Sequence, residues 1–272
     1  MNSVRLQKLI LSMLHDPYFR TRMLNESEWV EQTFNCRPTE IAHVLSFDER
    51  LQRADPMRAD RLLTGLFDVY PVSVWSILTP HVFTNLRAFF QSEAFHRAIW
   101  DEGFVHHSFG AFLIERYPKA MQYVRLECAI EDTRHLRYGR RNDAGKYVLH
   151  HAVQILSIKL GYLETFAAAR AAVQESDLGG AEFLLNMPEP INVPESTESN
   201  EFVLVEGGET PKIGGVSNGL GRLLTFLQAP RNYNELTQCL VAEGAEIDEC
   251  DDLILSFLTN RWIDGQVFTP HR

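Results

Sequence analysis

Two pairs of adjacent histidines, His106-His107 and His150-His151, are the residues of this sequence best suited to bind a metal ion. Neighbouring side chains point in different directions on a helix or a strand, so one pair seldom chelates a metal alone. No HExxH or His-x-His motif is present, and no carboxylate three or four residues further on completes a ligand set. We therefore interpret both pairs as surface or packing histidines. A metalloenzyme using these residues is the alternative, and single His→Ala variants that lose metal would support it.

Other residues with catalytic potential do not form recognisable motifs. The cysteines are spread along the chain without a CxxC pair, at Cys36, Cys128, Cys239 and Cys250. A chain of this length needs no disulfide framework, so we interpret them as buried or inert thiols. The sequence contains no P-loop, no GxGxxG after a strand, no GxSxG and no convincing cysteine–histidine pair. We expect no catalytic residues, no metal site and no cofactor of the chain's own.

A basic cluster lies around the C-terminal end of the predicted long helix, which ends near residue 138. Its members are Arg134, His135, Arg137, Arg140, Arg141 and Lys146. Cations complement the dipole at the C-terminal end of a helix, so a solvated helix end explains the cluster without any ligand. Arginine also pairs bidentately with carboxylates. The functional hypothesis is a contact with a substrate carboxylate or an acidic partner surface, made by Arg134, Arg137, Arg140 and Arg141.

The composition is that of an ordinary globular protein, with 272 residues, 45% hydrophobic and 23% charged, and a formal net charge of −10. The charge is uneven, because residues 175–272 contain 17 acidic and 5 basic side chains while residues 1–174 carry a net charge of +2. This difference indicates two domains, which we place at residues 1–178 and 179–272. The acidic balance also argues against bulk electrostatic binding of nucleic acid.

The N-terminal segment and the hydrophobicity pattern bear on localisation. Residues 1–14 are too charged and too helical in pattern for a signal peptide. No apolar run of 18 residues occurs in the sequence. We therefore expect a cytoplasmic protein with no membrane partner.

Residues 1–140 have the pattern of a series of short helices. Apolar residues recur at helical spacing at Leu6, Leu9, Ile10, Met13 and Leu14. Helix starts are indicated where a capping residue precedes a proline, at Asp16-Pro17, Asp55-Pro56 and Thr79-Pro80. Dense apolar residues between 61 and 95 predict several helices packed on one another. Further helices are predicted near 108–116 and 119–138.

The pattern changes after residue 145. A β-branched apolar run at 153–158 predicts a strand, although periodicity alone does not separate it from a buried helix. Residues 162–174 are rich in alanine and predict a helix that Gly179-Gly180 ends. Three prolines with scattered polar residues make 187–200 a linker or long loop.

The last 70 residues have the clearest order. Strands are predicted at 202–205 and 212–216, separated by a Gly-Gly turn. Helices are predicted at 220–228, 233–242 and 249–262, and a short strand at Gln266-Val267-Phe268 follows. We therefore expect an α+β protein: an all-helical N-terminal domain, then a winged-helix-like module with a small sheet.

Winged helices most often bind DNA through the third helix. Here that helix begins with acidic residues at Glu249, Asp251 and Asp252, which would face phosphates. Like-charge repulsion over the acidic module makes DNA a poor ligand. An acidic winged-helix transcriptional regulator is nevertheless kept as an alternative, to be tested by DNA binding at low salt.

Peptide capture is a second use of this architecture. An exposed edge strand adds an extended peptide through main-chain hydrogen bonds, while a neighbouring helix supplies apolar pockets. The segment Lys212–Val216 is short and interrupted by glycines, so a partner backbone can approach it closely. Leu253, Leu255 and Phe257 are candidates for the groove, but we interpret Leu255 and Leu258 as core residues. The predicted peptide-binding residues are Lys212, Ile213, Gly214, Gly215, Val216, Leu253, Phe257 and Arg261.

This C-terminal region resembles the recognition element of enzymes that modify ribosomally synthesised peptides (RiPPs). The similar segments are 202–205, Lys212-Ile213, 220–227, Asn234-Glu235-Leu236 and 253–263. The resemblance implies a small winged-helix-like domain that captures the leader segment of a precursor peptide between its third strand and third helix.

The N-terminal half is similar to a helical domain found in partner proteins of multinuclear non-haem iron oxygenases. The similar residues are Arg61-Leu62-Leu63, Tyr70-Pro71, 72–78, Phe89-Phe90, Phe95 and 110–113. Such partners form a heterodimer with a TIM-barrel iron enzyme, as in the methanobactin and 3-thiaglutamate pathways. The resemblance implies that the barrel subunit holds the iron and that this chain presents the precursor peptide to it, for modification of a peptide cysteine in the 3-thiaglutamate type.

Overall fold

The computed structural model describes residues 3–47, 55, 57–101, 103–134, 146–195 and 197–265. The described chain is a mostly helical α+β structure with short strands. It forms two compact units, which we call the helical unit (Met1–Val124 with Ala169–Asn192) and the sheet unit (Arg125–Ala168 with Val193–Arg272). The boundaries fall within α11 (Met121–Arg134) and within α12 (Tyr162–Glu175), so the chain passes between the units more than once.

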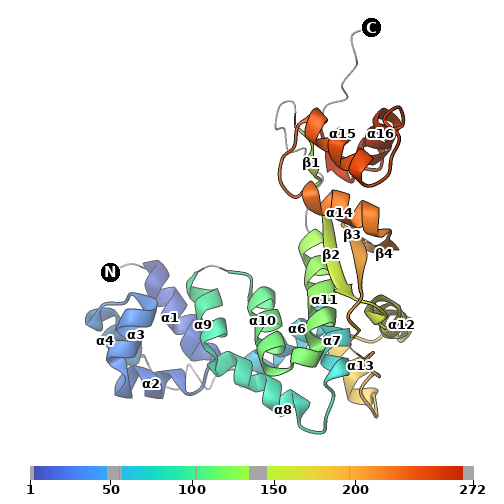
Figure 1. Ribbon diagram of the computed structural model, residues 1–272. Coiled ribbons are helices and arrows are strands. Elements are labelled where there is room, and N and C mark those ends of the chain that lie inside the picture. The colour runs from blue at the N-terminus through green and yellow to red at the C-terminus, as the bar shows by residue number, and fades with distance from the viewer. Residues whose placement is uncertain are drawn as a thin grey trace. The chain divides into compact units, whose positions relative to one another are not determined.

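The helical unit consists of short helices (Figure 1). They are α1 (Ser3–His15), α2 (Phe19–Asn25), α3 (Ser27–Phe34), α4 (Pro38–Leu45), α6 (Arg58–Val69), α7 (Pro71–Ser76), α8 (Val82–Leu86), η1 (Arg87–Gln91), α9 (Glu93–Trp100), α10 (Val105–Arg116), η2 (Pro118–Ala120) and α13 (Gly180–Asn186). The series of helices that the apolar pattern predicts is confirmed for the described residues. The predicted Leu6, Leu9 and Met13 face is buried in α1.

Asp16 does not have the role of a helix cap that the sequence predicts. The next helix, α2, begins at Phe19 rather than at Pro17. The Asp16 carboxylate is fully buried, where Oδ2 lies 3.1 Å from Nε2 of His96 and Oδ1 accepts a hydrogen bond from the Tyr18 N–H at 2.8 Å. A buried carboxylate needs such partners, and His96 is 80 residues away in the sequence.

All strands among the described residues belong to the sheet unit. They are β1 (Val148–Leu149), β2 (Val153–Lys159), β3 (Asn200–Glu206), β4 (Lys212–Val216) and β5 (Ile263–Asp264), and they are accompanied by α14 (Asn218–Phe226), α15 (Tyr233–Ala242) and α16 (Cys250–Thr259). One antiparallel sheet has the order β2-β3-β4 (Figure 1). The short strands β1 and β5 pair in a separate two-stranded sheet. The predicted strands at 202–205 and 212–216 and the predicted helices of this region are confirmed.

Two expectations about this region need correction. The region before residue 178 is not all helical, because the β-branched run at 153–158 is a strand that pairs with β3 from Val153↔Glu206 to Lys159↔Asn200. The compact units also differ from the expected division at 178/179, since this pairing places residues 125–168 with the C-terminal region. The strand expected at 266–268 lies outside the described residues, and β5 precedes it at Ile263–Asp264.

Local sequence explains how the helices of the sheet unit begin. Asn232 caps α15, because its Oδ1 accepts the Glu235 N–H at 2.9 Å while the Glu235 carboxylate accepts the Asn232 N–H at 2.8 Å. Ser217 caps α14 through a bond from the Leu220 N–H at 3.3 Å. These helices pack on one face of the sheet, around Ile155 and Leu204. A Cβ on Gly221 of α14 would lie 2.1 Å from Cγ of Phe202, so a glycine is needed there for helix and strand to approach.

Candidate functional site

The segment predicted to bind a peptide is β4, which lies at the edge of the three-stranded sheet. It pairs with β3 from Phe202↔Val216 to Glu206↔Lys212, and no other described strand pairs with its outer side. Lys212, Gly214 and Gly215 are exposed, while Ile213 and Val216 are half-buried. The outer edge of β4 therefore has the backbone geometry on which an extended peptide adds as a further strand.

The register assigns each residue of β4 to one face of the sheet. Directly paired residues share a face, so Gly214 lies with Leu204 and Ile155 on the face that α14, α15 and α16 cover. Ile213 and Gly215 belong to the opposite face, with Val205 and Val203. Leu163 of α12 lies on that side, since its Cδ2 is 3.4 Å from where a Cβ of Gly215 would be.

The predicted residues of α16 differ in exposure. Leu253 is half-buried and packs against the core of the sheet unit. Phe257 is only 7% exposed and stacks on Trp262 with ring centroids 6.0 Å apart, so it is a core residue rather than an open groove wall. Leu255, which we interpreted as core, is 49% exposed. The correction follows from helix geometry, because Cys250, Ile254 and Phe257 form the buried face and Leu255 projects away from it.

Arg261 and the basic cluster lie elsewhere. Arg261 follows α16 with a left-handed backbone (φ 58°) and an exposed side chain. Arg134 is exposed at the end of α11, and its Nη1 lies 2.9 Å from a carboxylate oxygen of Glu131. Arg137, Arg140 and Arg141 lie outside the described residues. The hypothesis of a carboxylate contact at this cluster stays a prediction.

One histidine pair meets a carboxylate that the sequence did not indicate. The nitrogens of His150 and His151 and the carboxylate of Asp264 all lie within 4.8 Å of one another, and His150 and Asp264 are buried. The pairing of β1 with β5 brings them together, with Val148 opposite Asp264 and the His150 N–H donating to the Trp262 carbonyl at 2.9 Å. No local signal could have found Asp264, because it lies more than a hundred residues further along the chain.

The hydrogen bonding of His150 does not fit a metal ligand. Its Nδ1 accepts the Ala152 N–H at 3.1 Å, so the neutral ring carries its proton on Nε2. A nitrogen that binds a metal must have a free lone pair. Burial is the main cause that lowers the pKa of His150 below its ordinary 6.5, and Asp264 partly offsets it. The arrangement favours a buried neutral histidine beside a carboxylate over a metal centre.

The other histidine pair and the cysteines are the remaining residues that the sequence suggested for metal binding or nucleophilic chemistry. His106 and His107 lie on α10, half-buried and exposed respectively, with ring centroids 4.3 Å apart. None of the four cysteines takes part in a disulfide bond. Burial is the main cause that raises the pKa of Cys36 to about 12, which leaves its thiol protonated and a poor nucleophile.

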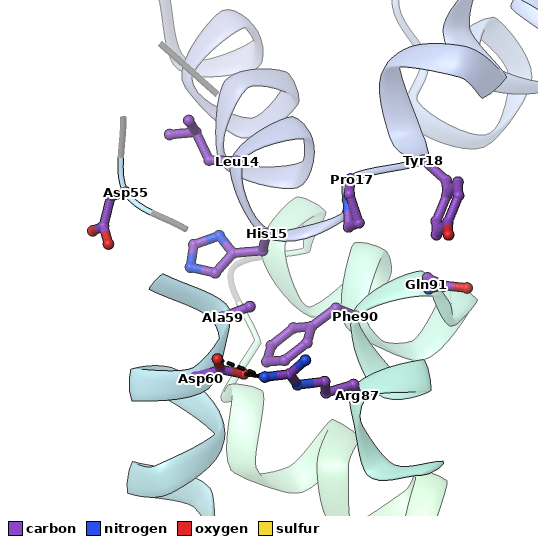
Figure 2. A pocket seen from close by; sticks show the side chains of 10 residues that line it. All are labelled: Leu14, His15, Pro17, Tyr18, Asp55, Ala59, Asp60, Arg87, Phe90 and Gln91. Carbon is purple, nitrogen blue, oxygen red and sulfur yellow. Dashed lines mark hydrogen bonds and ion pairs between the residues drawn. The ribbon is translucent and has the colours of Figure 1, made fainter. Parts of the chain in front are cut away.

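The helical unit has a pocket of about 640 Å³, shown in Figure 2. It is lined by Leu14, His15, Pro17, Tyr18, Asp55, Ala59, Asp60, Arg87, Phe90 and Gln91. Its charged groups are already paired, since Arg87 Nη2 donates to Asp60 at 2.6 Å and the guanidinium of Arg61 binds the Asp55 carboxylate. His15 donates from Nδ1 to the Leu11 carbonyl at 3.0 Å, and burial is the main cause that lowers its pKa.

Comparisons with known proteins were made at three levels. No family model, curated protein or solved structure matches this chain. Within the described residues, none of the helices combines the length and the apolar character required to cross a bilayer.

Proposed function

We propose that this chain is a non-catalytic adaptor that binds a ribosomal precursor peptide and presents it to a TIM-barrel multinuclear iron oxygenase. In this proposal β2-β3-β4 with α14–α16 is a winged-helix-like RiPP recognition element, and the leader segment adds to the outer edge of β4. The helical unit docks the oxygenase in a heterodimer, and the iron belongs to the partner. The reaction of this complex is the modification of a cysteine in the precursor peptide, as in pathways of the 3-thiaglutamate type.

The observation that carries the proposal is the unpaired edge of β4 in a sheet followed by three packed helices. This is the element order that the resemblance implies, and β2 supplies a first strand from outside the segment that carries it. Strand addition uses main-chain hydrogen bonds, so a short glycine-containing strand is a suitable acceptor. Holding the leader raises the effective concentration of the peptide at the metal site, so an adaptor accelerates the reaction without contributing a reacting group.

The acidic start of α16 favours this proposal over a transcriptional regulator. Asp251 and Asp252 are exposed in its first turn, where the third helix of a DNA-binding module would approach phosphates. The Asp251 carboxylate accepts a hydrogen bond from the Tyr233 hydroxyl at 2.6 Å, and this bond fixes the position of the side chain at that surface. Repulsion from the phosphate backbone would oppose DNA binding there.

The test uses the short precursor peptide and the TIM-barrel protein that we expect to be encoded beside this chain. The full-length chain is titrated with the fluorescein-labelled leader and, separately, with a labelled random-sequence DNA duplex at low salt. We expect saturable leader binding and no duplex binding. Elemental analysis should find iron in the reconstituted pair and none at stoichiometric level in the pure chain. No binding of the leader, or tightly held metal with turnover in the chain alone, overturns the proposal.

The binding mode is tested by proline substitution in β4. Along an antiparallel edge strand the N–H groups point alternately inward and outward, so one of Gly214→Pro and Gly215→Pro removes an outward donor and the other removes a bond to β3. The variant that keeps the wild-type melting temperature should lose at least about tenfold in leader affinity. If that variant binds the leader like the wild type, strand addition at β4 is contradicted.

A further inference from the structure

A pocket of about 430 Å³ lies beside β4 on the face of the sheet away from α14–α16. It is lined by Leu160, Gly161, Leu163, Glu164, Ala167, Glu201 and Ile213. These residues come from the loop before α12, the first turns of α12, the start of β3 and the edge strand β4 itself. The pocket therefore adjoins the edge to which the proposed peptide adds, on the side opposite the apolar helices.

The walls of this pocket combine an apolar surface with two carboxylates. Leu163, Ala167 and Ile213 give the apolar side. Glu201 is held in place, because its Oε1 accepts the N–H groups of Gly161 at 3.0 Å and Leu163 at 3.3 Å. Glu164 is exposed in the first turn of α12, and the described residues that line the pocket include no lysine or arginine.

An added strand would present side chains to this pocket by its own geometry. Successive side chains of a strand alternate between the two faces of a sheet, so every second residue of the peptide points toward α12 rather than toward α14–α16. On that face β4 offers Ile213 and then Gly215, and the glycine leaves open the space that a side chain would fill next to Leu163. One side chain of the peptide thus has a route past Gly215 or Ile213 into the pocket.

We propose that this pocket binds a lysine or arginine side chain of the leader peptide. Long basic side chains lay their methylene stems on apolar surface and keep the charged head at polar groups. Leu163 and Ile213 suit the stem, and the carboxylates of Glu201 and Glu164 suit the head. This inference rests on the proposed function, and it adds a specificity site on the second face of the sheet.

The experiment measures affinity of the full-length chain for the fluorescein-labelled leader of the precursor encoded beside it. Each lysine or arginine of the leader is replaced in turn by norleucine, which keeps the stem and removes the charge. We expect one position to weaken binding by about 2- to 5-fold, and Glu164→Gln to weaken it by a similar factor. Glu164→Lys should weaken it by about tenfold. A glutamate at the same leader position should restore binding to the Glu164→Lys variant.

The matched control is Glu246→Lys, which makes the same charge change at an exposed position of the sheet unit outside the pocket. It should alter affinity by less than about twofold. A leader that binds the wild type and the Glu164→Lys variant equally, or that binds and contains no lysine or arginine, overturns the pocket assignment and leaves the proposed function standing. A wild-type chain that binds no leader overturns the proposed function and this inference together.

Discussion

The two pockets described above, one in the helical unit and one in the sheet unit, differ in how their carboxylates are compensated. In the helical unit Asp60 pairs with Arg87 (Figure 2), and Asp55 pairs with Arg61, so the charges are balanced by the chain itself. In the sheet unit Glu201 is held by backbone N–H groups, and no basic residue lines the pocket with it. The smaller pocket is thus the one whose charge a cationic group from outside would complement. Volume alone would favour the pocket of the helical unit as the binding site, because it is the larger of the two.

A substitution at Gly221 should have the largest effect on stability, and it should destabilise the sheet unit without destabilising the helical unit. The Cβ of Gly221→Ala would lie 2.1 Å from Cγ of Phe202, and such overpacking costs about 1–3 kcal/mol. Chemical denaturation monitored by hydrogen exchange should show that the sheet unit has lost free energy of unfolding. The control is Gly65→Ala in α6, where no atom lies within 4 Å of the new Cβ, and it should stabilise the helical unit by about 0.5–1 kcal/mol. Equal losses in both variants would contradict this packing argument.

The role of Glu201 can be divided into charge and hydrogen bonding. Glu201→Ala removes the acceptor for the N–H groups of Gly161 and Leu163, and loss of such a cap costs about 1 kcal/mol. Glu201→Gln keeps an oxygen acceptor, so thermal unfolding should detect a smaller loss. If the two variants lose the same stability, the carboxylate charge rather than the hydrogen bonds stabilises the start of α12.

His15 in the helical unit and His150 in the sheet unit should make the stability of each unit depend on pH. Burial is the main cause that lowers the folded-state pKa of both His15 and His150 below 6.5, so the unfolded chain binds more protons as the pH falls below that value. Both units should therefore lose stability from about pH 6.5 downward. His150→Asn keeps an acceptor for the Ala152 N–H and cannot titrate, so it should flatten the pH dependence of the sheet unit only.

His15→Asn should have the corresponding effect in the helical unit, and hydrogen exchange at pH 7.5 and 5.5 assigns each change to its unit. His151→Asn serves as the control, since His151 is adjacent and half-buried, while the Ala152 N–H donates to Nδ1 of His150. A wild-type pH dependence in the His150→Asn variant would show that another group is responsible.

The smallest effect is expected at the exposed acid of the helical pocket. The hydrogen bond from Arg61 is the main cause that lowers the pKa of Asp55. Arg61→Gln should raise that pKa toward its ordinary value of 3.8, as measured by NMR titration. Arg22→Gln, which breaks a pair with Glu26 elsewhere in the unit, should leave the pKa of Asp55 unchanged. An unchanged Asp55 in the Arg61→Gln variant would contradict the self-compensated description of this pocket.

Elements defined by local pattern were predictable from the sequence, and those defined by distant partners were not. The face of α1, the strands β3 and β4 and the helices α14–α16 follow from short-range periodicity and capping. The pairing of β2 with β3 could not be inferred, because periodicity says nothing about which strand lies beside another. Asp16 had a plausible local role as a cap, and only the fold shows that His96 is its partner.

The candidate site shows the same division. The exposed segment Lys212–Val216 was visible in the sequence, and the structure places it at the sheet edge. Glu201 and Glu164 carry no local motif, and they share a pocket only because α12 begins beside β3 and β4. Leu255 was misassigned because a run of apolar residues on a helix does not reveal which of them faces the core.

The pairing of β1 with β5 affects the order in which the parts of the sheet unit can fold during synthesis. Val148 pairs with Asp264, so this contact forms only after synthesis has passed Asp264, whereas β2 needs the chain only as far as Glu206 and β4 only as far as Val216. The edge strand can therefore be assembled on the ribosome before the three C-terminal helices cover the sheet. A nascent chain arrested after β4 would expose Leu204 and Ile155 to solvent, which makes that stage the point of greatest need for a chaperone.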